Sequence, residues 1–201
     1  MNQPVRRLGM FGGAFDPPHR AHVALAQAAV GQLQLDQLRI FPTGNAWHKS
    51  RALTPAEHRL AMARLAFAAI PEAEVDDREI RRTGPTYTLE TLRELHAEFP
   101  QAELFLVMGA DQARAFTGWR DWQAIAQLAT LAVAGRDGPA EGGGQHFGLP
   151  SEARIQPLQL PLMDDSATGI RVRLAAGQDA GAPLPAGVAG YIAAHYLYLP
   201  T

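Results

Sequence analysis

Two histidines and a pair of glycines near the N-terminus have residue types and spacing suited to phosphate chemistry. Gly12 and Gly13 directly follow a short apolar run, where glycines let backbone N–H groups approach a ligand closely. His19 and His22 are three residues apart at the expected start of a helix, so both imidazoles would lie on one face of its positive end. The pattern predicts that two imidazoles face a phosphate chain. The alternative is a tight turn followed by a surface pair of histidines.

Other kinds of site use similar residues, but the spacing argues against them. Gly9, Gly12 and Gly13 do not fit the dinucleotide fingerprint, and no Gly-Lys-Ser/Thr of a P-loop follows. Zinc held by a helical histidine pair favours i, i+4 spacing with an intervening glutamate, which His19 and His22 lack. The chain has no cysteine, so thiolate nucleophiles and cysteine-ligated metals are excluded. We therefore expect no protein-ligated metal.

The elements that must position these residues alternate between short apolar runs and amphipathic stretches, a pattern typical of βαβ units and a parallel sheet. Strands are expected over 8–11, 38–41, 74–80, 103–108, 130–134 and 155–160. Helices are expected over 21–33, 54–69, 88–99, 122–128 and 185–195, and after Ser166. Thr54, Pro55 and Glu57 predict a capping box for the second helix, and a polar turn is expected over 109–112. With no repeat or long linker, 1–201 is predicted to be one α/β domain.

Composition excludes several classes of partner. The 201 residues include 18 basic and 20 acidic side chains, a formal net charge of −2, so no global basic field favours nucleic acid or an anionic membrane. No run of about 18 apolar residues predicts a membrane span, and the N-terminal apolar run is too short for a signal peptide. We expect a cytoplasmic protein without nucleic-acid or membrane partners, and the sequence indicates no particular oligomeric state.

The run Gly-Gly-x-Phe-Asp-Pro-x-His-x-x-His, over 12–22, resembles the signature of the nucleotidyltransferase superfamily of small adenylyltransferases. That resemblance implies that His19 and His22 contact nucleotide phosphates and stabilise the transition state at the α-phosphorus. It also implies that Gly12, Gly13 and Phe15 bind ATP. The fold it implies is a Rossmann-like open parallel sheet with helices on both faces and the site at the carboxyl ends of the strands.

Four further segments are similar to bacterial nicotinate-nucleotide adenylyltransferases, in the order of that family. They are Pro42 with His48-Lys49, the Thr-Tyr-Thr segment within 84–92, Met108-Gly109-Ala110-Asp111 with Phe116 and Trp119, and Ser166-Ala167-Thr168-Gly169-Ile170-Arg171. The resemblance implies adenylyl transfer from ATP to nicotinate mononucleotide in NAD synthesis, with Mg²⁺ brought by the ATP phosphates. It assigns Arg171 to catalysis, Lys49, Arg136, Ser166 and Thr168 to ATP, and Thr86, Tyr87, Thr88, Asp111 and Trp119 to the mononucleotide.

Most of these assignments have a physical reason and a structural alternative. Ser166 and Thr168 suit the capping of a helix that starts near Gly169, and Arg171 could hold phosphate oxygens or be a solvated helix residue. Trp119 offers a flat face to a pyridinium ring. Asp111 fits either a mononucleotide contact or a turn cap.

Other functions remain open from the sequence. The nearest alternative is the same reaction with nicotinamide mononucleotide as acceptor. Adenylyl transfer to phosphopantetheine is a more distant alternative. A nucleotide-binding sensor without catalysis is disfavoured because the histidine pair and the Ser-x-Thr-x-Ile-Arg segment are intact. An NAD-dependent oxidoreductase is disfavoured by the glycine spacing.

Overall fold

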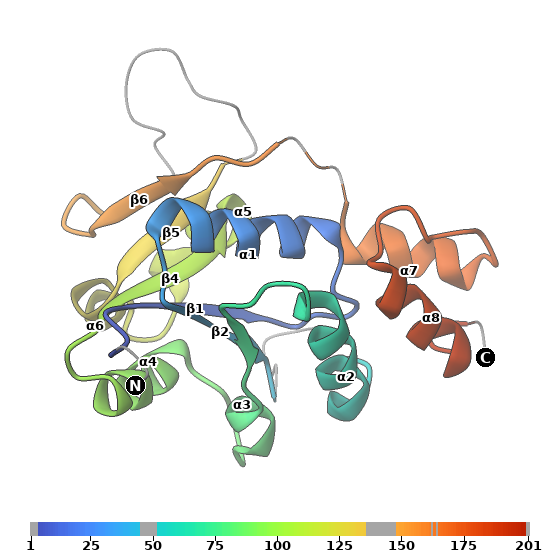
Figure 1. The fold of residues 1–201 in the computed structure, drawn as a ribbon, viewed down its shortest axis with the longest axis horizontal. Coiled ribbons are helices and arrows are strands. Elements are labelled where there is room, and N and C mark those ends of the chain that lie inside the picture. The colour runs from blue at the N-terminus through green and yellow to red at the C-terminus, as the bar shows by residue number, and fades with distance from the viewer. Residues whose placement is uncertain (1–3, 45–51, 136–147, 162, 164, 200–201) are drawn as a thin grey trace.

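The centre of the molecule is a six-stranded sheet in the order β3-β2-β1-β4-β5-β6, in which every neighbouring pair is parallel (Figure 1). This computed structural model describes residues 4–44, 52–135, 148–161, 163 and 165–199. The strands are β1 (Arg7–Gly13), β2 (Gln37–Pro42), β3 (Ala73–Val75), β4 (Glu103–Gly109), β5 (Thr130–Ala134) and β6 (Ile155–Leu158). The predicted α/β class and open parallel sheet are confirmed.

Helices connect the strands and follow the last one. They are α1 (Arg20–Leu33), α2 (Ala56–Phe67), α3 (Arg78–Arg81), α4 (Thr88–Glu98), α5 (Ala110–Ala115), the 3₁₀ turn η1 (Phe116–Gly118), α6 (Trp122–Leu128), α7 (Ala167–Ala175) and α8 (Ala186–Ala194). Within the described ranges, none of these helices is long and apolar enough to cross a bilayer.

The strand order changes direction in the middle of the sheet. The chain runs outward from β1 through β2 to β3 and then returns to β4, on the other side of β1. Open parallel sheets bind ligands at such a switch point, beyond the carboxyl ends of the strands. The segments that follow β1 and β4 are therefore the expected walls of the site.

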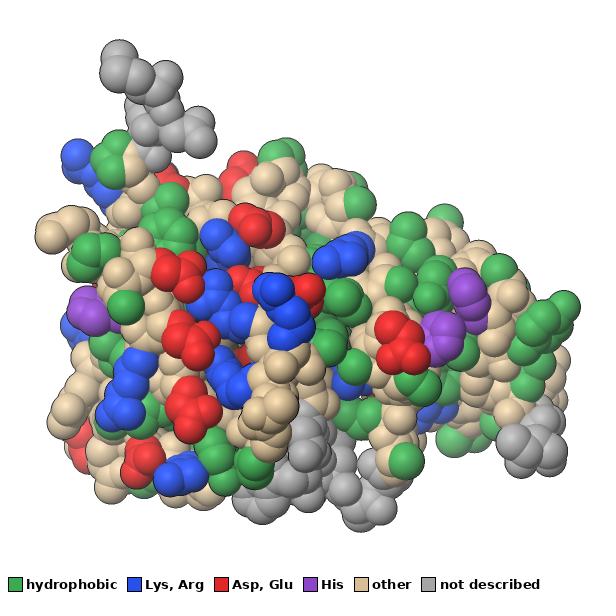
Figure 2. Space-filling view, turned by 90° about the horizontal axis from the view of Figure 1, so that it is seen from below, with side chains coloured by type: hydrophobic (Ala, Val, Ile, Leu, Met, Phe, Trp, Pro, Cys, Tyr) green, Lys and Arg blue, Asp and Glu red, His purple; other side chains and the backbone are tan. Residues whose placement is uncertain are grey.

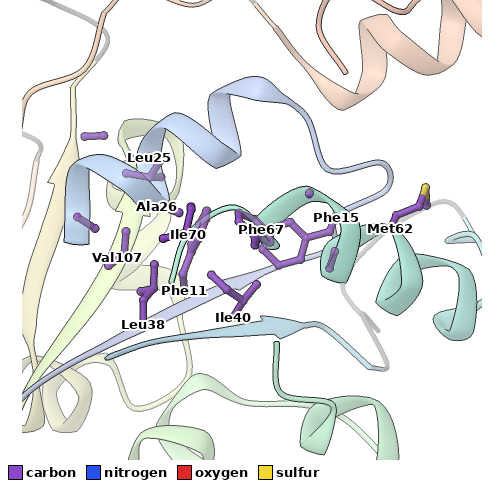
Figure 3. Packing of buried hydrophobic residues seen from close by; sticks show 14 of the residues in the cluster. Phe11, Phe15, Leu25, Ala26, Leu38, Ile40, Met62, Phe67, Ile70 and Val107 are labelled. Carbon is purple, nitrogen blue, oxygen red and sulfur yellow. The ribbon is translucent and has the colours of Figure 1, made fainter. Parts of the chain in front are cut away.

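Two apolar layers cover the two faces of the sheet. On one face, α1 and α2 pack with residues of α7 and α8, and the rings of Phe11, Phe15 and Phe67 meet near the carboxyl end of β1 (Figure 3). On the other face, α4, α5 and α6 bury the second core cluster. Helices on both faces agree with the prediction, and α7 and α8 lie together at one end of the molecule (Figure 1).

Three local predictions were wrong. The N-cap residue of α2 is Pro55, without a side-chain cap, so Thr54 does not cap the helix; the Thr54 side chain lies beside Tyr198 instead. The stretch predicted as one strand over 74–80 splits into β3 and α3, since Asp76 accepts hydrogen bonds from the main chain and side chain of Arg78. The stretch 109–112 is not an open turn, because α5 begins directly after β4.

Candidate active site

His19 and His22 lie together at the start of α1, as their spacing predicts. His19 is the N-cap residue of the helix and His22 lies in its first turn. Their ring centroids are 3.8 Å apart with a 35° angle between the planes. The His19 N–H donates to Nδ1 of His22 at 3.2 Å. Because Nδ1 accepts this bond, a neutral His22 has its proton on Nε2, which becomes a donor for an anion.

The ring of His22 packs against the buried side chain of Phe15. Phe15 is 1% exposed, and its ring centroid lies 5.2 Å from that of His22 in an edge-to-face arrangement. Phe15 has a left-handed backbone with φ of 46°, which directs its side chain into the aromatic cluster of Figure 3. The side chain of Phe15 therefore supports His22, and only its main chain can face a nucleotide.

His19 is neutral at physiological pH. It is 7% exposed, and burial lowers its pKa to about 4, although the carboxylate of Asp165 acts in the opposite direction. Its Nδ1 is buried without a hydrogen-bond partner among the described residues. A ligand can then reach the ring only through the other nitrogen. A bound phosphate would favour the protonated ring, because an anion lowers the cost of the charge.

Asp16 is the point at which the elements of the site converge. Its carboxylate is buried and accepts a hydrogen bond from the Tyr198 hydroxyl at 2.7 Å and a longer one from the Thr54 N–H at 3.4 Å. Nη1 of Arg171 donates to its main-chain carbonyl oxygen at 2.8 Å. Arg171 thus reaches from α7 to the loop that leads to His19, and the three proposed catalytic residues lie around one loop.

A buried arginine ties that loop to its neighbours. Arg59, on α2, is 2% exposed and donates to carbonyl oxygens of Ala14 at 3.0 Å, Thr43 at 2.7 Å, Gly44 at 3.4 Å and Thr54 at 2.9 Å. These carbonyls belong to the β1–α1 loop, the end of β2 and the segment before α2. The planar guanidinium suits such a fan of acceptors, and it fixes three segments relative to one another.

The start of α7 agrees only in part with the capping prediction. Ser166 is the N-cap residue, and its Oγ accepts from the N–H of Gly169 at 3.1 Å. The helix begins at Ala167, two residues before the predicted start, so Thr168 lies inside it and its Oγ1 accepts from Nη2 of Arg171 at 3.1 Å. We call the β1–α1 loop (14–19), His22 and 165–171 the phosphate side of the site.

The acceptor side, defined as 84–88 with 116–120, is joined by aromatic contacts. The guanidinium carbon of Arg120 lies 4.5 Å from the centroid of the Tyr87 ring. Trp119 is partly buried and packs against Phe116, with centroids 5.6 Å apart. Oγ1 of Thr86 is buried without a partner among the described residues. The Thr-Tyr-Thr segment assigned to the mononucleotide and Trp119, the residue with a flat face for the pyridinium ring, therefore lie on one wall.

Tyr87 and Thr88 form the start of α4. Tyr87 is its N-cap residue, and the described residues give this helix no side-chain cap. First-turn N–H groups at such an end favour an anion. Asp111, in the first turn of α5, is an exposed carboxylate paired with Arg114.

An ion-pair network supports the segment before Tyr87. Nη2 of Arg82 donates to Glu94 at 2.7 Å and its Nη1 to Oγ1 of Thr91 at 3.2 Å, and Thr91 donates to the buried Glu79 at 2.8 Å. Burial raises the pKa of Glu79 to about 7. Arg78 continues the network toward Glu98 and Asp76; Figure 2 shows acidic and basic side chains intermingled on this face.

Some predicted residues cannot be placed, and others were missed. Lys49 and Arg136 lie outside the described residues, as does His48. The signature includes Asp16 without indicating its role, and no pattern in the sequence points to Tyr198. Arg59 could have been found, because it shares a helix face with the buried Met62, Ala63 and Ala66, where an arginine must have partners.

The comparisons with known proteins assign a class first. Residues 10–173 match the family model described as Cytidylyltransferase-like. A solved Plasmodium falciparum nicotinic acid mononucleotide adenylyltransferase, complexed with NaAD, has a similar fold, with a TM-score of 0.76 at 15% identity over 96% of this chain and 97% of that one. The chain is a member of the cytidylyltransferase-like family.

Closer relatives then narrow the assignment. A probable nicotinate-nucleotide adenylyltransferase of Albidiferax ferrireducens is 53% identical over 196 residues, which cover 96% of this chain and 98% of the relative. The protein of the same name from Methylibium petroleiphilum is 43% identical over 98% of this chain and 94% of its own. Within its class, the chain belongs with the nicotinate-nucleotide adenylyltransferases, as the resemblance in its sequence implies.

Proposed function

We propose that the protein transfers the adenylyl group of ATP to nicotinate mononucleotide, in the synthesis of NAD. A phosphate oxygen of the mononucleotide attacks the α-phosphorus of ATP. The bond from that phosphorus to the bridging oxygen breaks, and the electron pair leaves with pyrophosphate. The product is nicotinate adenine dinucleotide, and no covalent enzyme intermediate is needed.

One observation carries the proposal: the rings of His19 and His22 lie 3.8 Å apart at the start of α1, and Arg171 reaches from α7 to the preceding loop through the carbonyl oxygen of Asp16. Imidazole N–H and guanidinium groups are donors for phosphate oxygens. Donors directed at the charge that develops in the transition state contribute strongly to catalysis. The names of the relatives supply the acceptor, since those from Albidiferax ferrireducens and Methylibium petroleiphilum are both called probable nicotinate-nucleotide adenylyltransferases.

Catalysis then consists of alignment and charge stabilisation. In this proposal Nε2–H of His22 and the Arg171 guanidinium donate to oxygens of the reacting phosphates, and His19 binds the same anion and becomes protonated as it does so. The remaining contacts to ATP come from Gly12, Gly13, the main chain of Phe15, Lys49, Arg136, Ser166 and Thr168.

The acceptor is recognised on the acceptor side and by Asp111. N–H groups of Thr86, Tyr87 and Thr88 bind the nicotinate carboxylate, while the pyridinium stacks on Trp119. Cation–π attraction contributes about 1 kcal/mol or more when the ring is desolvated. Asp111 contacts the remainder of the mononucleotide.

Mg²⁺ would enter with ATP rather than bind to a protein cage. The site offers nitrogen donors, and both oxygens of the buried Asp16 carboxylate already accept hydrogen bonds. In the described ranges, no three His, Asp or Glu side chains come together as metal ligands. The described residues therefore do not fit a magnesium cage. The metal's part would be to neutralise phosphate charge.

A pyrophosphate-release assay tests the proposal. ATP with Mg²⁺ is offered with nicotinate mononucleotide, nicotinamide mononucleotide or phosphopantetheine, and we expect the fastest release with the first. Preference for the amide would reassign the acceptor, and release with none of the three would refute adenylyl transfer. The cytoplasmic location stays a prediction from the sequence.

A further inference from the structure

We propose that Tyr198 is a positioning residue for the phosphate side: its hydroxyl holds Asp16 so that the β1–α1 loop and Arg171 are aligned for ATP. The contact joins residues 182 positions apart, with Tyr198 Oη donating to Oδ1 of Asp16 at 2.7 Å. The inference rests on the proposed function for its kinetic readout, because it concerns how the same site binds its nucleotide.

Asp16 transmits the position of Tyr198 to the reacting groups. It is 1% exposed and lies three residues before His19, so a displaced Asp16 moves the N-cap of α1. Its carbonyl oxygen is also the acceptor for Nη1 of Arg171. Asp16 therefore contacts Tyr198 through its side chain and Arg171 through its main chain.

The backbone after α8 turns Tyr198 back toward the site. Tyr196 and Tyr198 have φ values of 52° and 66°, in the left-handed region that residues with side chains seldom adopt. Such a conformation persists only where surrounding contacts determine it. For Tyr198 these contacts are packing against the core layer of α1 and α2 and the hydrogen bond to Asp16.

The hydroxyl of Tyr198 is suited to permanent donation. Burial and the neighbouring Asp16 carboxylate raise its pKa far above the usual value for tyrosine, so it stays protonated. Without this hydroxyl, Oδ1 of the buried carboxylate would lose this donor, and the guanidinium of Arg171, which already donates to the Asp16 carbonyl oxygen, could take its place. Arg171 would then be drawn away from phosphate, which is a functional effect rather than a loss of packing.

A second contact ties the C-terminal part of the chain to the same place. The N–H of Arg20, the first residue of α1, donates to the carbonyl oxygen of Pro183 at 2.8 Å. The segment before α8 therefore contacts the first residue of α1, and Tyr198, after α8, contacts the loop that leads to α1.

The test is the Y198F variant with Y191F as its matched control. Phenylalanine at 198 retains the ring and removes only the oxygen. The hydroxyl of Tyr191, on α8, is hydrogen-bonded to Nδ1 of His58 at 3.0 Å, so Y191F removes a comparable bond without touching Asp16. Pyrophosphate release is measured with ATP and nicotinate mononucleotide varied in turn, and melting temperatures are recorded.

For Y198F we expect kcat/KM for ATP to fall by about tenfold to a hundredfold, the range for a hydrogen bond to a charged group. In Y198F, KM for the mononucleotide should change by less than about twofold. In the Y191F control, kcat/KM for ATP should also change by less than about twofold. Wild-type kinetics in Y198F, or an equal loss toward ATP in both variants, would overturn the inference. Failure of the proposed function looks different, because wild type itself would then release no pyrophosphate with nicotinate mononucleotide.

Hydrogen exchange on the wild-type protein keeps the inference testable if Y198F does not fold. A non-hydrolysable ATP analogue should slow amide exchange in 196–199 as well as in the β1–α1 loop. Protection confined to the loop would contradict coupling between the tail and the nucleotide.

Discussion

The phosphate side and the acceptor side are built in opposite ways. On the phosphate side, His19 is buried, Asp16 is buried, and Arg59 fixes three segments through carbonyl oxygens. On the acceptor side, Arg120 is 61% exposed and is held over Tyr87 by a ring contact, with Asp121 beside it. The loop of the first region is fixed by hydrogen bonds in the interior, whereas Arg120 and Tyr87 of the second are joined by a contact at the surface.

This difference matches the demands of the proposed reaction. Alignment of an anionic nucleophile with the α-phosphorus needs groups held to within a fraction of an ångström. A mononucleotide must also enter before the reaction and a larger dinucleotide must leave after it. A rigid region for the reacting phosphates and a less constrained one for the pyridine ring satisfy both. Variants in the two regions should therefore alter different kinetic constants.

The largest effect is expected from His22→Ala. The change removes a donor to the reacting phosphates but leaves Phe15 packed against Phe11 and Phe67, so we expect kcat to fall roughly 10²–10³-fold. The melting temperature should change little. Steady-state kinetics and a thermal melt provide the measurement, and a folded variant with near-normal kcat would remove His22 from the mechanism.

Two buried groups, His19 on the phosphate side and Glu79 in the network that supports the segment before Tyr87, should change stability with pH in opposite directions. The pKa of His19 is about 4 in the folded protein and near 6.5 unfolded, so between these values the unfolded state binds more protons and stability falls as pH decreases. The pKa of Glu79 is about 7 folded and near 4.5 unfolded, so the folded state binds more protons and stability falls as pH increases through that window. Across its pH window, the pKa shift of each group changes the free energy of unfolding by about 3 kcal/mol.

Urea unfolding of H19N and E79Q, measured from pH 7 to pH 4, separates the two contributions. Relative to wild type, the free energy of unfolding of H19N should decrease less on acidification, and that of E79Q should decrease more. The His19 contribution is already complete above pH 6.5, whereas that of Glu79 is complete only below pH 4.5. Parallel curves for wild type and both variants would show that neither burial is maintained in solution.

Trp119→Ala should weaken the acceptor without affecting ATP. Loss of the aromatic face removes stacking and cation–π attraction, which predicts an increase of about tenfold in KM for nicotinate mononucleotide. KM for ATP should remain within about twofold, because Trp119 lies outside the phosphate side. Trp119→Phe is the matched control and should retain part of the affinity. An effect mainly on ATP would mean that the two regions are not independent.

The smallest effect is expected from Arg120→Gln. Its guanidinium stands over Tyr87, where a positive charge favours an acidic acceptor over the neutral amide. Because the side chain is exposed, screening limits the contribution to about 0.2–1 kcal/mol. We expect the ratio of kcat/KM for acid over amide to decrease about two to five times. An equal loss toward both acceptors would restrict Arg120 to support of Tyr87.

The sequence predicts a structural feature well when the residues that determine it are close together in the chain. The bounds of β5 were predicted to the residue, since a continuous apolar run determines them, and α6 lies where a helix was expected. The histidine pair was found because its members are three residues apart. The capping box at Thr54 is absent, and the Thr54 side chain lies instead beside Tyr198, which is far away in the sequence. The roles of Asp16 and Tyr198 depend on the same kind of contact, which no local pattern contains.

The hydrogen bond from Tyr198 to Asp16 also has a consequence for biosynthesis. A ribosome makes Asp16 182 positions before Tyr198, so a growing chain can pair β1 with β2 long before Tyr198 exists. On this proposal, the phosphate side becomes aligned only after Tyr198 has left the ribosome. Chains that stop before Tyr198 would form much of the sheet yet lack an aligned phosphate side.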